Sequence, residues 1–283
     1  MIARSRLSAC VLMAPSWDLA QCVAGWRRAG LAAIGVTIDR VEALGVRRAV
    51  EVLLSSGLKV ANLQGIEPFD VVHPERFDDR LARTLPYLDL ASTLNADCVY
   101  ACSGARAGLE WEVAADRLVA QLTTLLPHLQ ERGVRLALEP IHPIRQDLSF
   151  VNLATDVEDI LARVPDPSVG YVYDFWHLWW QRHALAVARR TATRVFSVQP
   201  SDHKPVTLRT LDRAVPGQGI APVGALLAAL EDGGYQGFYD LEVLSPDNDE
   251  KGYDRALEET ITGFAEAAGG LGEEVSVRSY GPR

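Results

Sequence analysis

Short apolar segments alternate along this chain with longer segments in which apolar residues recur every three or four positions. The short segments are rich in β-branched and aromatic residues, which is typical of buried strands, and the longer ones have the period of amphipathic helices. The predicted strands are Leu7–Met13, Ala33–Ile38, Lys59–Gly65, Asp97–Cys102, Val134–Leu138, the start of Tyr171–Trp180, Arg194–Val198 and Phe238–Glu242. The predicted helices are Leu19–Ala29, Val46–Ser56, Glu75–Leu94, Trp111–Arg132, Ala154–Arg163, Ala184–Thr191, Pro222–Gly233 and Asp254–Ala268.

Strict alternation of strand and helix predicts an α/β protein, and eight such units favour a parallel (β/α)8 TIM barrel. An open, doubly wound sheet is the main competitor, but no glycine-rich fingerprint follows the first predicted strand. No shift in composition separates the units, so we expect residues 1–283 to form a single domain. The segment from about 270 to 283 carries Gly, Ser and charged residues without periodicity, and we expect it to be a flexible tail.

The composition is that of a globular protein, with 283 residues of which 48% are hydrophobic. The net charge is −9, from 28 basic and 37 acidic side chains, and no basic stripe stands out. This argues against nucleic acid or an anionic membrane as partner and favours a small-molecule substrate. The four cysteines lack both CxxC spacing and the density of a secreted scaffold, and no segment is long and apolar enough to span a bilayer. We therefore expect a cytoplasmic protein.

Polar side chains stand where four consecutive predicted strands, the fifth to the eighth, end. They are Glu139, Asp174, Gln199 and Glu242. A barrel brings the carboxyl ends of its strands together, and three converging carboxylates repel one another unless a cation neutralises them. Oxygen donors without sulfur suit Mn²⁺ or Mg²⁺ and leave Co²⁺, Fe²⁺ or Zn²⁺ open. The sequence therefore predicts one divalent metal ion bound by these four residues, although each residue taken singly could equally be a surface carboxylate or a helix cap.

Asp174 is the residue for which a helix cap is the clearest alternative to a metal ligand. It ends the apolar strand in Tyr171–Trp180, and His177 follows three residues later. A strand-end carboxylate and a nearby imidazole can both point into one pocket. An N-capping Asp followed by an incidental His is the alternative.

Several motifs resemble those of the xylose-isomerase-like sugar phosphate isomerase/epimerase barrels. They are Glu139-Pro140, Asp174-x-x-His177, Arg213-x-x-Pro216-Gly217-x-Gly219 and Leu241-Glu242. The resemblance covers nearly the whole chain and implies a fold and a metal site more specifically than a substrate. It implies that Glu139, Asp174 and Glu242 bind metal, that Glu139 and Glu242 are also the catalytic proton-transfer pair, and that His177 and Arg213 bind substrate.

Gln199 departs from this pattern, because the epimerases of the superfamily usually carry a metal-binding His there. The dehydroshikimate dehydratase branch is more similar at this position, and an amide oxygen favours Mn²⁺ or Mg²⁺. The resemblance implies a metal-dependent isomerase or epimerase that acts on a small polyhydroxy ketone or aldehyde through an enediolate. A dehydratase of an inosose-like or 3-dehydroshikimate-like cyclic ketone is the alternative. Such barrels often pair, so a homodimer is compatible with the sequence.

Other polar and aromatic residues on the predicted barrel face carry weaker signals. His142 follows Glu139 closely and is a further candidate for substrate binding, with an ordinary loop His as the alternative. Gln64, Glu67 and His73 follow the third strand and have no assigned role. The tryptophans of Trp176–Trp180 either line the pocket or pack beneath a helix.

Overall fold

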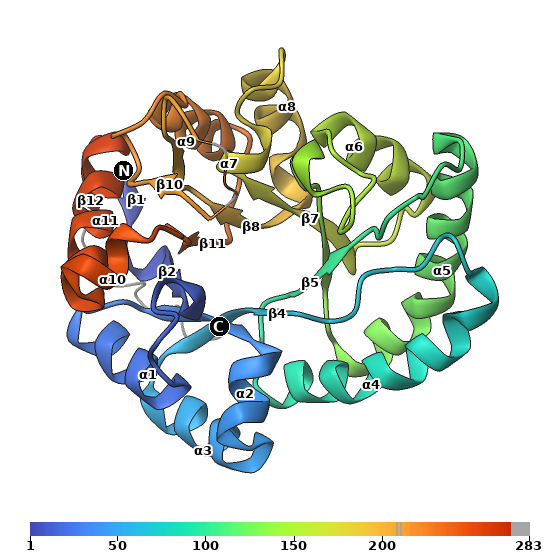
Figure 1. Cartoon of the computed structure of the whole chain (residues 1–283), viewed down its shortest axis with the longest axis horizontal. Helices are drawn as coiled ribbons and strands as arrows, with labels where there is room; N and C mark the ends of the chain where they lie inside the picture. Colours follow the sequence, from blue (N-terminus) through green and yellow to red (C-terminus); the bar gives the residue numbers. More distant parts are fainter. Residues whose placement is uncertain (208, 210, 273–283) are drawn as a thin grey trace, which may run out of the picture.

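Eight parallel strands close into a barrel in the computed structural model, which describes residues 1–207, 209 and 211–272. Figure 1 shows the barrel end-on, with helices arranged around the strands. Around the ring the order is β11-β2-β3-β4-β5-β6-β7-β8. The strands are β2 (Leu7–Cys10), β3 (Ala33–Thr37), β4 (Lys59–Gln64), β5 (Val99–Cys102), β6 (Leu136–Glu139), β7 (Val169–Asp174), β8 (Val195–Gln199) and β11 (Phe238–Leu241). The predicted (β/α)8 fold is confirmed.

The helices connect successive strands and cover the outside of the barrel (Figure 1). They are α1 (Leu19–Arg28), α2 (Ile38–Leu44), α3 (Val46–Ser56), α4 (Phe77–Thr93), α5 (Trp111–Arg132), α6 (Ala154–Arg163), α7 (Phe175–Leu178), α8 (Ala184–Thr191), α9 (Val223–Asp232), α10 (Asp247–Lys251) and α11 (Tyr253–Ala267). Four of them, α3, α5, α6 and α8, have the predicted bounds. Gly57 and Gly133 follow α3 and α5 in the left-handed conformation that glycine adopts without steric cost.

The strands are buried on both faces, which is why they read as continuous apolar runs. Residues that face the helices belong to one large core, whose members include Val99, Leu136 and Leu138. A second, smaller cluster consists of Cys98, Tyr100, Ala137, Val172 and Phe196. Alternate residues of a strand point to opposite faces, so the second cluster fills the barrel interior. The barrel is thus a packed core, with buried polar groups at its strand ends and a few in its interior.

Three sequence predictions need correction. The first strand ends at Cys10 rather than Met13, and Val11–Met13 form a 3₁₀ turn that Cys10 caps. A short buried turn and a short buried strand have the same apolar pattern, so periodicity alone does not separate them. Residues Ile38–Leu44 form a helix, α2, that the sequence pattern does not predict because it is only seven residues long.

The third correction concerns the tail. Leu271 and Gly272 form strand β12 (Leu271–Gly272), which pairs in parallel with β1 (Ile2–Ala3). Two residues are too short for a periodic signal, and the pairing joins opposite ends of the chain. The remainder of the predicted flexible tail, 273–283, lies outside the described residues.

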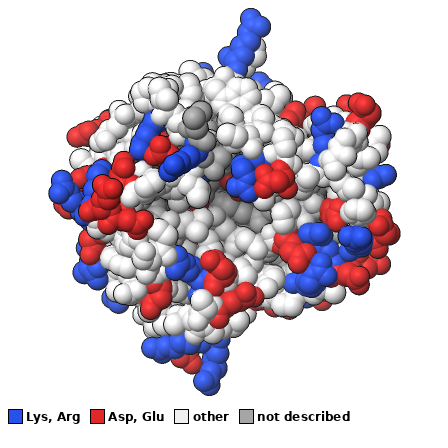
Figure 2. Space-filling view, viewed as in Figure 1, with Lys and Arg blue, Asp and Glu red and all other residues white. Residues whose placement is uncertain are grey.

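The end-on face of the molecule has a central hollow, and charged side chains of both signs are interspersed around it (Figure 2). Among the described helices, none combines the length and apolar character needed to cross a bilayer. The thiols of Cys10, Cys22, Cys98 and Cys102 are free.

Candidate active site

The predicted ligands Glu139, Asp174, Gln199 and Glu242 all lie at the carboxyl ends of their strands. Strand pairing aligns Asp174 of β7 directly with Gln199 of β8, and Cys102 of β5 with Glu139 of β6. Glu242 directly follows β11, which pairs with β8. Asp174 and Gln199 are fully buried, and Glu242 is 4% exposed. The barrel therefore brings donors from four consecutive units to one end, as the sequence predicts.

The two carboxylate oxygens of Asp174 have different partners. Oδ1 accepts a hydrogen bond from the backbone N–H of Trp176 at 2.7 Å and so caps α7. Oδ2 faces the site, where it lies 2.9 Å from Nη1 of Arg213 and 3.5 Å from Nε2 of His177. The two interpretations of Asp174 from the sequence are therefore compatible, because one oxygen caps the helix and the other faces the cluster.

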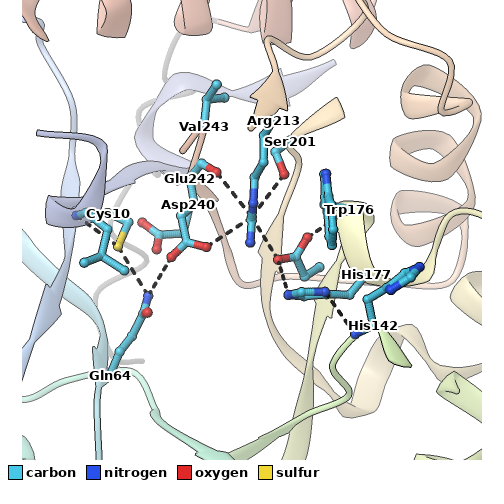
Figure 3. A network of polar contacts seen from close by, with 12 residues as sticks. Cys10, Gln64, His142, Trp176, His177, Ser201, Arg213, Asp240, Glu242 and Val243 are labelled. Carbon is cyan, nitrogen blue, oxygen red and sulfur yellow. Dashed lines mark hydrogen bonds and ion pairs between the residues drawn. The ribbon is translucent and has the colours of Figure 1, made fainter. Parts of the chain in front are cut away.

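Arg213 lies in the middle of the acidic cluster, on β10 (Arg213–Ala214), which pairs with β9 (Asp202–His203). Its Nη1 lies 2.9 Å from Asp174 Oδ2 and 3.1 Å from Glu242 Oε2, and it donates to Ser201 Oγ at 3.2 Å (Figure 3). The Trp176 ring lies 5.8 Å from the guanidinium carbon. Burial lowers the pKa of Arg213, but the neighbouring Asp174 and Glu242 charges more than offset this and raise it. The buried arginine thus supplies one positive charge to the cluster.

Glu139 and Glu242 differ in their partners. Glu242 is held by Arg213 at Oε2 and by Gln64 Nε2 at Oε1, at 3.4 Å. Glu139 lies beside Asp174 and His177, where one ligand atom of each residue falls within 4.8 Å of the others. Burial, followed by the Asp174 and Glu242 charges, raises the pKa of Glu139 well above its usual value. Burial also raises the pKa of Glu242, while Arg213 opposes that shift. Of these two glutamates, Glu242 is the one that forms an ion pair with Arg213 in the described part of the chain.

His177 is held as a neutral ring with a defined tautomer. Its Nδ1 accepts the backbone N–H of His142 at 3.1 Å, so in the neutral ring the proton is on Nε2, which faces Asp174 Oδ2. Burial lowers the pKa of His177 to about 4. A protonated Nε2 has no lone pair for a metal, so His177 suits a donor to Asp174 or to substrate better than a metal ligand. The His142 ring instead packs against Trp176 and Trp180, with centroids 5.4 and 5.6 Å away.

The residues present fit a divalent cation. Gln199 is fully buried, yet neither its Oε1 nor its Nε2 has a hydrogen-bond partner among the described residues. Asp174 Oδ2 forms an ion pair with Arg213, but it accepts no hydrogen bond from the described residues. Buried polar groups are rarely left without partners, and such groups beside two further carboxylates suit a cation with oxygen ligands. Glu139, Asp174, Gln199 and Glu242 would hold it.

Sequence reasoning did not assign Gln64 to the site, although it lies there. Its amide contacts Glu242 and also Cys10 Sγ at 3.5 Å (Figure 3). Glu67 instead pairs with Arg80 and Arg83 at the surface, and the side chain of His73 is exposed. Gln64 is the last residue of its strand, and this position is the one sequence feature that indicates a place in the site. An uncharged side chain at a strand end is common, so this feature alone does not predict a functional residue.

Asp202 explains the Pro216-Gly217-x-Gly219 motif that follows Arg213. Its Oδ2 accepts the backbone N–H groups of Gly217 at 3.0 Å and Gly219 at 2.9 Å, and its Oδ1 accepts that of Ala221 at 2.9 Å. A Cβ atom on Gly219 would lie 2.4 Å from Asp202 Oδ1, so glycine is required there for the backbone to approach. The motif thus fixes the loop that follows the site arginine.

We expect Asp202→Asn to destabilise the protein by about 1–3 kcal/mol, because an amide NH₂ would then face backbone donors in place of an acceptor. Asp232→Asn is the matched control, since Asp232 is exposed and pairs with Arg189 at the surface, where an ion pair contributes about 0–1 kcal/mol. Urea unfolding of the two variants measures the difference. Equal stability of both variants would contradict this role of Asp202.

Comparison with known proteins places these features in a family. Residues 27–262 match the family model described as xylose isomerase-like TIM barrel. An inosose isomerase from Bacillus licheniformis is 28% identical over 148 residues, which cover 50% of each chain. The chain thus spans half the length of this curated relative.

Solved structures agree with the fold. A protein from Sinorhizobium meliloti 1021 has a TM-score of 0.84 at 24% identity, covering 94% of this chain and 99% of its own. The IOLI protein, whose structure has a bound zinc atom, has a TM-score of 0.82 at 19% identity, covering 93% of this chain and 97% of its own. With a family model matched over most of its length and a barrel of the same architecture, this chain belongs to the xylose isomerase-like TIM barrel family.

Proposed function

We propose that this protein is a divalent-metal-dependent isomerase or epimerase of a small polyhydroxy ketone or aldehyde. The observation that carries the proposal is the cluster of Glu139, Asp174, Gln199 and Glu242, in which the buried Gln199 amide and Asp174 Oδ2 have no hydrogen-bond partner in the described chain. A zinc atom in the structurally similar IOLI protein supports a divalent ion, with Mn²⁺ or Mg²⁺ favoured here by the all-oxygen donor set. When bound, such an ion would polarise a substrate carbonyl and acidify the neighbouring C–H group.

The protein's own residues would move the proton and hold the substrate. One of Glu139 and Glu242 takes the proton from the carbon next to the carbonyl, and the other returns a proton to a different face or carbon. The Arg213 guanidinium donates to a substrate oxygen, and His177, neutral with its proton on Nε2, can donate a further hydrogen bond. Arg213, His177 and Glu242 are buried, which strengthens the electrostatic interactions that they make.

We infer that inososes are the substrate class to test first. The supporting observation is the inosose isomerase that is similar over half of this chain. A six-membered ring bearing a ketone and neighbouring hydroxyls has the oxygen pattern that the proposed chemistry needs. The same chemistry would expel a hydroxyl group placed β to the carbonyl, and the protein would then be a dehydratase.

Metal removal tests the proposal. The protein is stripped with a chelator, its metal content is measured, and inososes and ketoses are followed by NMR in D₂O before and after addition of Mn²⁺ or Mg²⁺. We expect deuterium uptake or isomer formation only in the metal-loaded sample. A conjugated enone that absorbs in the ultraviolet identifies the dehydratase instead. Full activity after thorough metal removal contradicts the metal-dependent mechanism.

A further inference from the structure

A second group of polar side chains lies in the barrel interior, on β2, β4 and β11. Asp240 of β11 accepts hydrogen bonds from Ser8 Oγ of β2 at 2.5 Å and from Asn62 Nδ2 of β4 at 2.8 Å. Asn62 Oδ1 in turn accepts from Gln64 Nε2 at 3.1 Å. Ser8, Asn62 and Asp240 are all fully buried. Nothing in the proposed chemistry uses this group directly.

The contact between Asp240 and Asn62 crosses the barrel. Their strands β11 and β4 are separated in the ring by β2 and β3, so the two side chains meet in the interior. Gly35 of β3 leaves the space for this contact, since a Cβ atom there would lie 2.4 Å from Asp240 Oδ2. A buried carboxylate in an apolar barrel costs free energy unless it is hydrogen-bonded. The missing side chain at Gly35 and the two bonds to Asp240 therefore indicate a built network.

The network is directional. The NH₂ group of Asn62 donates to Asp240 Oδ2, so its carbonyl oxygen is the end that faces Gln64. Gln64 must then donate to that oxygen, and its Nε2 also contacts Glu242 Oε1 at 3.4 Å. The opposite amide orientation would place the Gln64 carbonyl oxygen against a carboxylate. The chain of contacts thus determines which end of Gln64 faces Glu242.

We infer that Asp240, Asn62 and Gln64 form a positioning relay that orients the Glu242 carboxylate. With Oε1 held by Gln64, Oε2 turns toward Arg213 and Asp174, where the proposed cation would bind. The inference deepens the proposed function, because Glu242 is one of the four proposed ligands. Asp240 and Asn62 are positioning residues that act through Gln64. Outer partners of this kind typically change metal affinity by about 10–100-fold.

Four variants test the relay. Asn62→Ala removes the central amide, and Asp240→Leu removes the acceptor below it. Asp240→Asn is the conservative rescue, because its carbonyl can still accept from Asn62 while its NH₂ faces Ser8 Oγ. Tyr100→Phe is the matched control, since it deletes a different buried bond across the interior, from Tyr100 OH to Ser197 Oγ at 2.6 Å. Thermal melts first establish which variants are folded, and Asn62→Leu replaces any relay variant that is not.

The first measurement uses metal-free protein and does not depend on the proposed function. Exchange of the Gln64 side-chain NH₂ with water is followed by ¹⁵N NMR, with the resonance assigned by its loss in Gln64→Met. We expect exchange about tenfold faster in Asn62→Ala and Asp240→Leu, as the loss of one buried hydrogen bond implies, and unchanged in Tyr100→Phe and Asp240→Asn. Unchanged exchange in the two relay-breaking variants, or an equal change in Tyr100→Phe, overturns the inference.

The second measurement is the Kd for Mn²⁺, obtained by calorimetric titration of each folded variant. We expect about a tenfold increase in Kd for Asn62→Ala and Asp240→Leu, and wild-type values for Asp240→Asn and Tyr100→Phe. Equal Kd values for wild type and the relay-breaking variants overturn the inference while leaving the proposed metal site intact. If wild-type protein binds no divalent ion, the proposed function fails, and the amide exchange alone decides whether the relay exists.

Discussion

Glu139→Gln and Glu242→Gln should each lower kcat by about 10²–10⁴-fold, because an amide cannot exchange a proton with the substrate carbon. Glutamine keeps a neutral oxygen at nearly the same position, so part of the metal affinity should remain. The two carboxylates come from β6 and from the end of β11, with β7 and β8 between them around the ring. They can therefore approach a bound carbonyl compound from different sides.

The two variants should differ in their partial reactions. Each is incubated with substrate in D₂O, and deuterium uptake at the carbon next to the carbonyl is followed by NMR. The variant that no longer exchanges has lost the base that opens the reaction. Glu67→Gln is the matched control, because Glu67 pairs with Arg83 at the surface, away from the cluster. Undiminished turnover in both site variants would rule out the two-glutamate mechanism.

Arg213→Met should destabilise the metal-free protein by about 3–5 kcal/mol, the usual effect of removing one partner from a buried ion pair. Nη1 of Arg213 is within 3.1 Å of carboxylate oxygens of both Asp174 and Glu242, and the side chain is 4% exposed. Without it, two buried carboxylates lose their counter-charge. A divalent ion at the same cluster would restore positive charge, so added Mn²⁺ should raise the stability of Arg213→Met more than that of wild type.

Denaturant unfolding with and without Mn²⁺ measures this effect, and Arg213→Lys separates charge from shape. Lysine keeps the positive charge but loses the forked guanidinium, so we expect KM to rise with a smaller loss of stability. A large fall in Tm of Arg213→Lys with unaltered KM would mean that the arginine only braces its loop. Wild-type stability of Arg213→Met without metal would contradict the charge-balancing role.

The fold and the strand ends that carry the candidate site residues can be predicted from the order of apolar and polar residues. Alternation of short apolar runs with amphipathic segments is a local property of each unit, and α3, α5, α6 and α8 begin and end where their patterns do. Glu139, Asp174, Gln199 and Glu242 could be found because barrel topology turns four separate strand ends into neighbours. Leu271–Gly272 and α2 were not found, because both are too short for a period to register.

The contacts that each candidate site residue makes could not be predicted from the sequence, because they depend on tertiary structure. The position of Arg213 between two carboxylates, the neutral tautomer of His177 and the Asp240–Asn62–Gln64 chain each depend on atoms from strands far apart in sequence. Such contacts depend on the register and curvature of the closed barrel and on the space that Gly35 leaves empty. A linear pattern specifies which face a residue occupies, but hydrogen-bond direction and counter-charge are set by neighbours that only folding brings within about 3 Å.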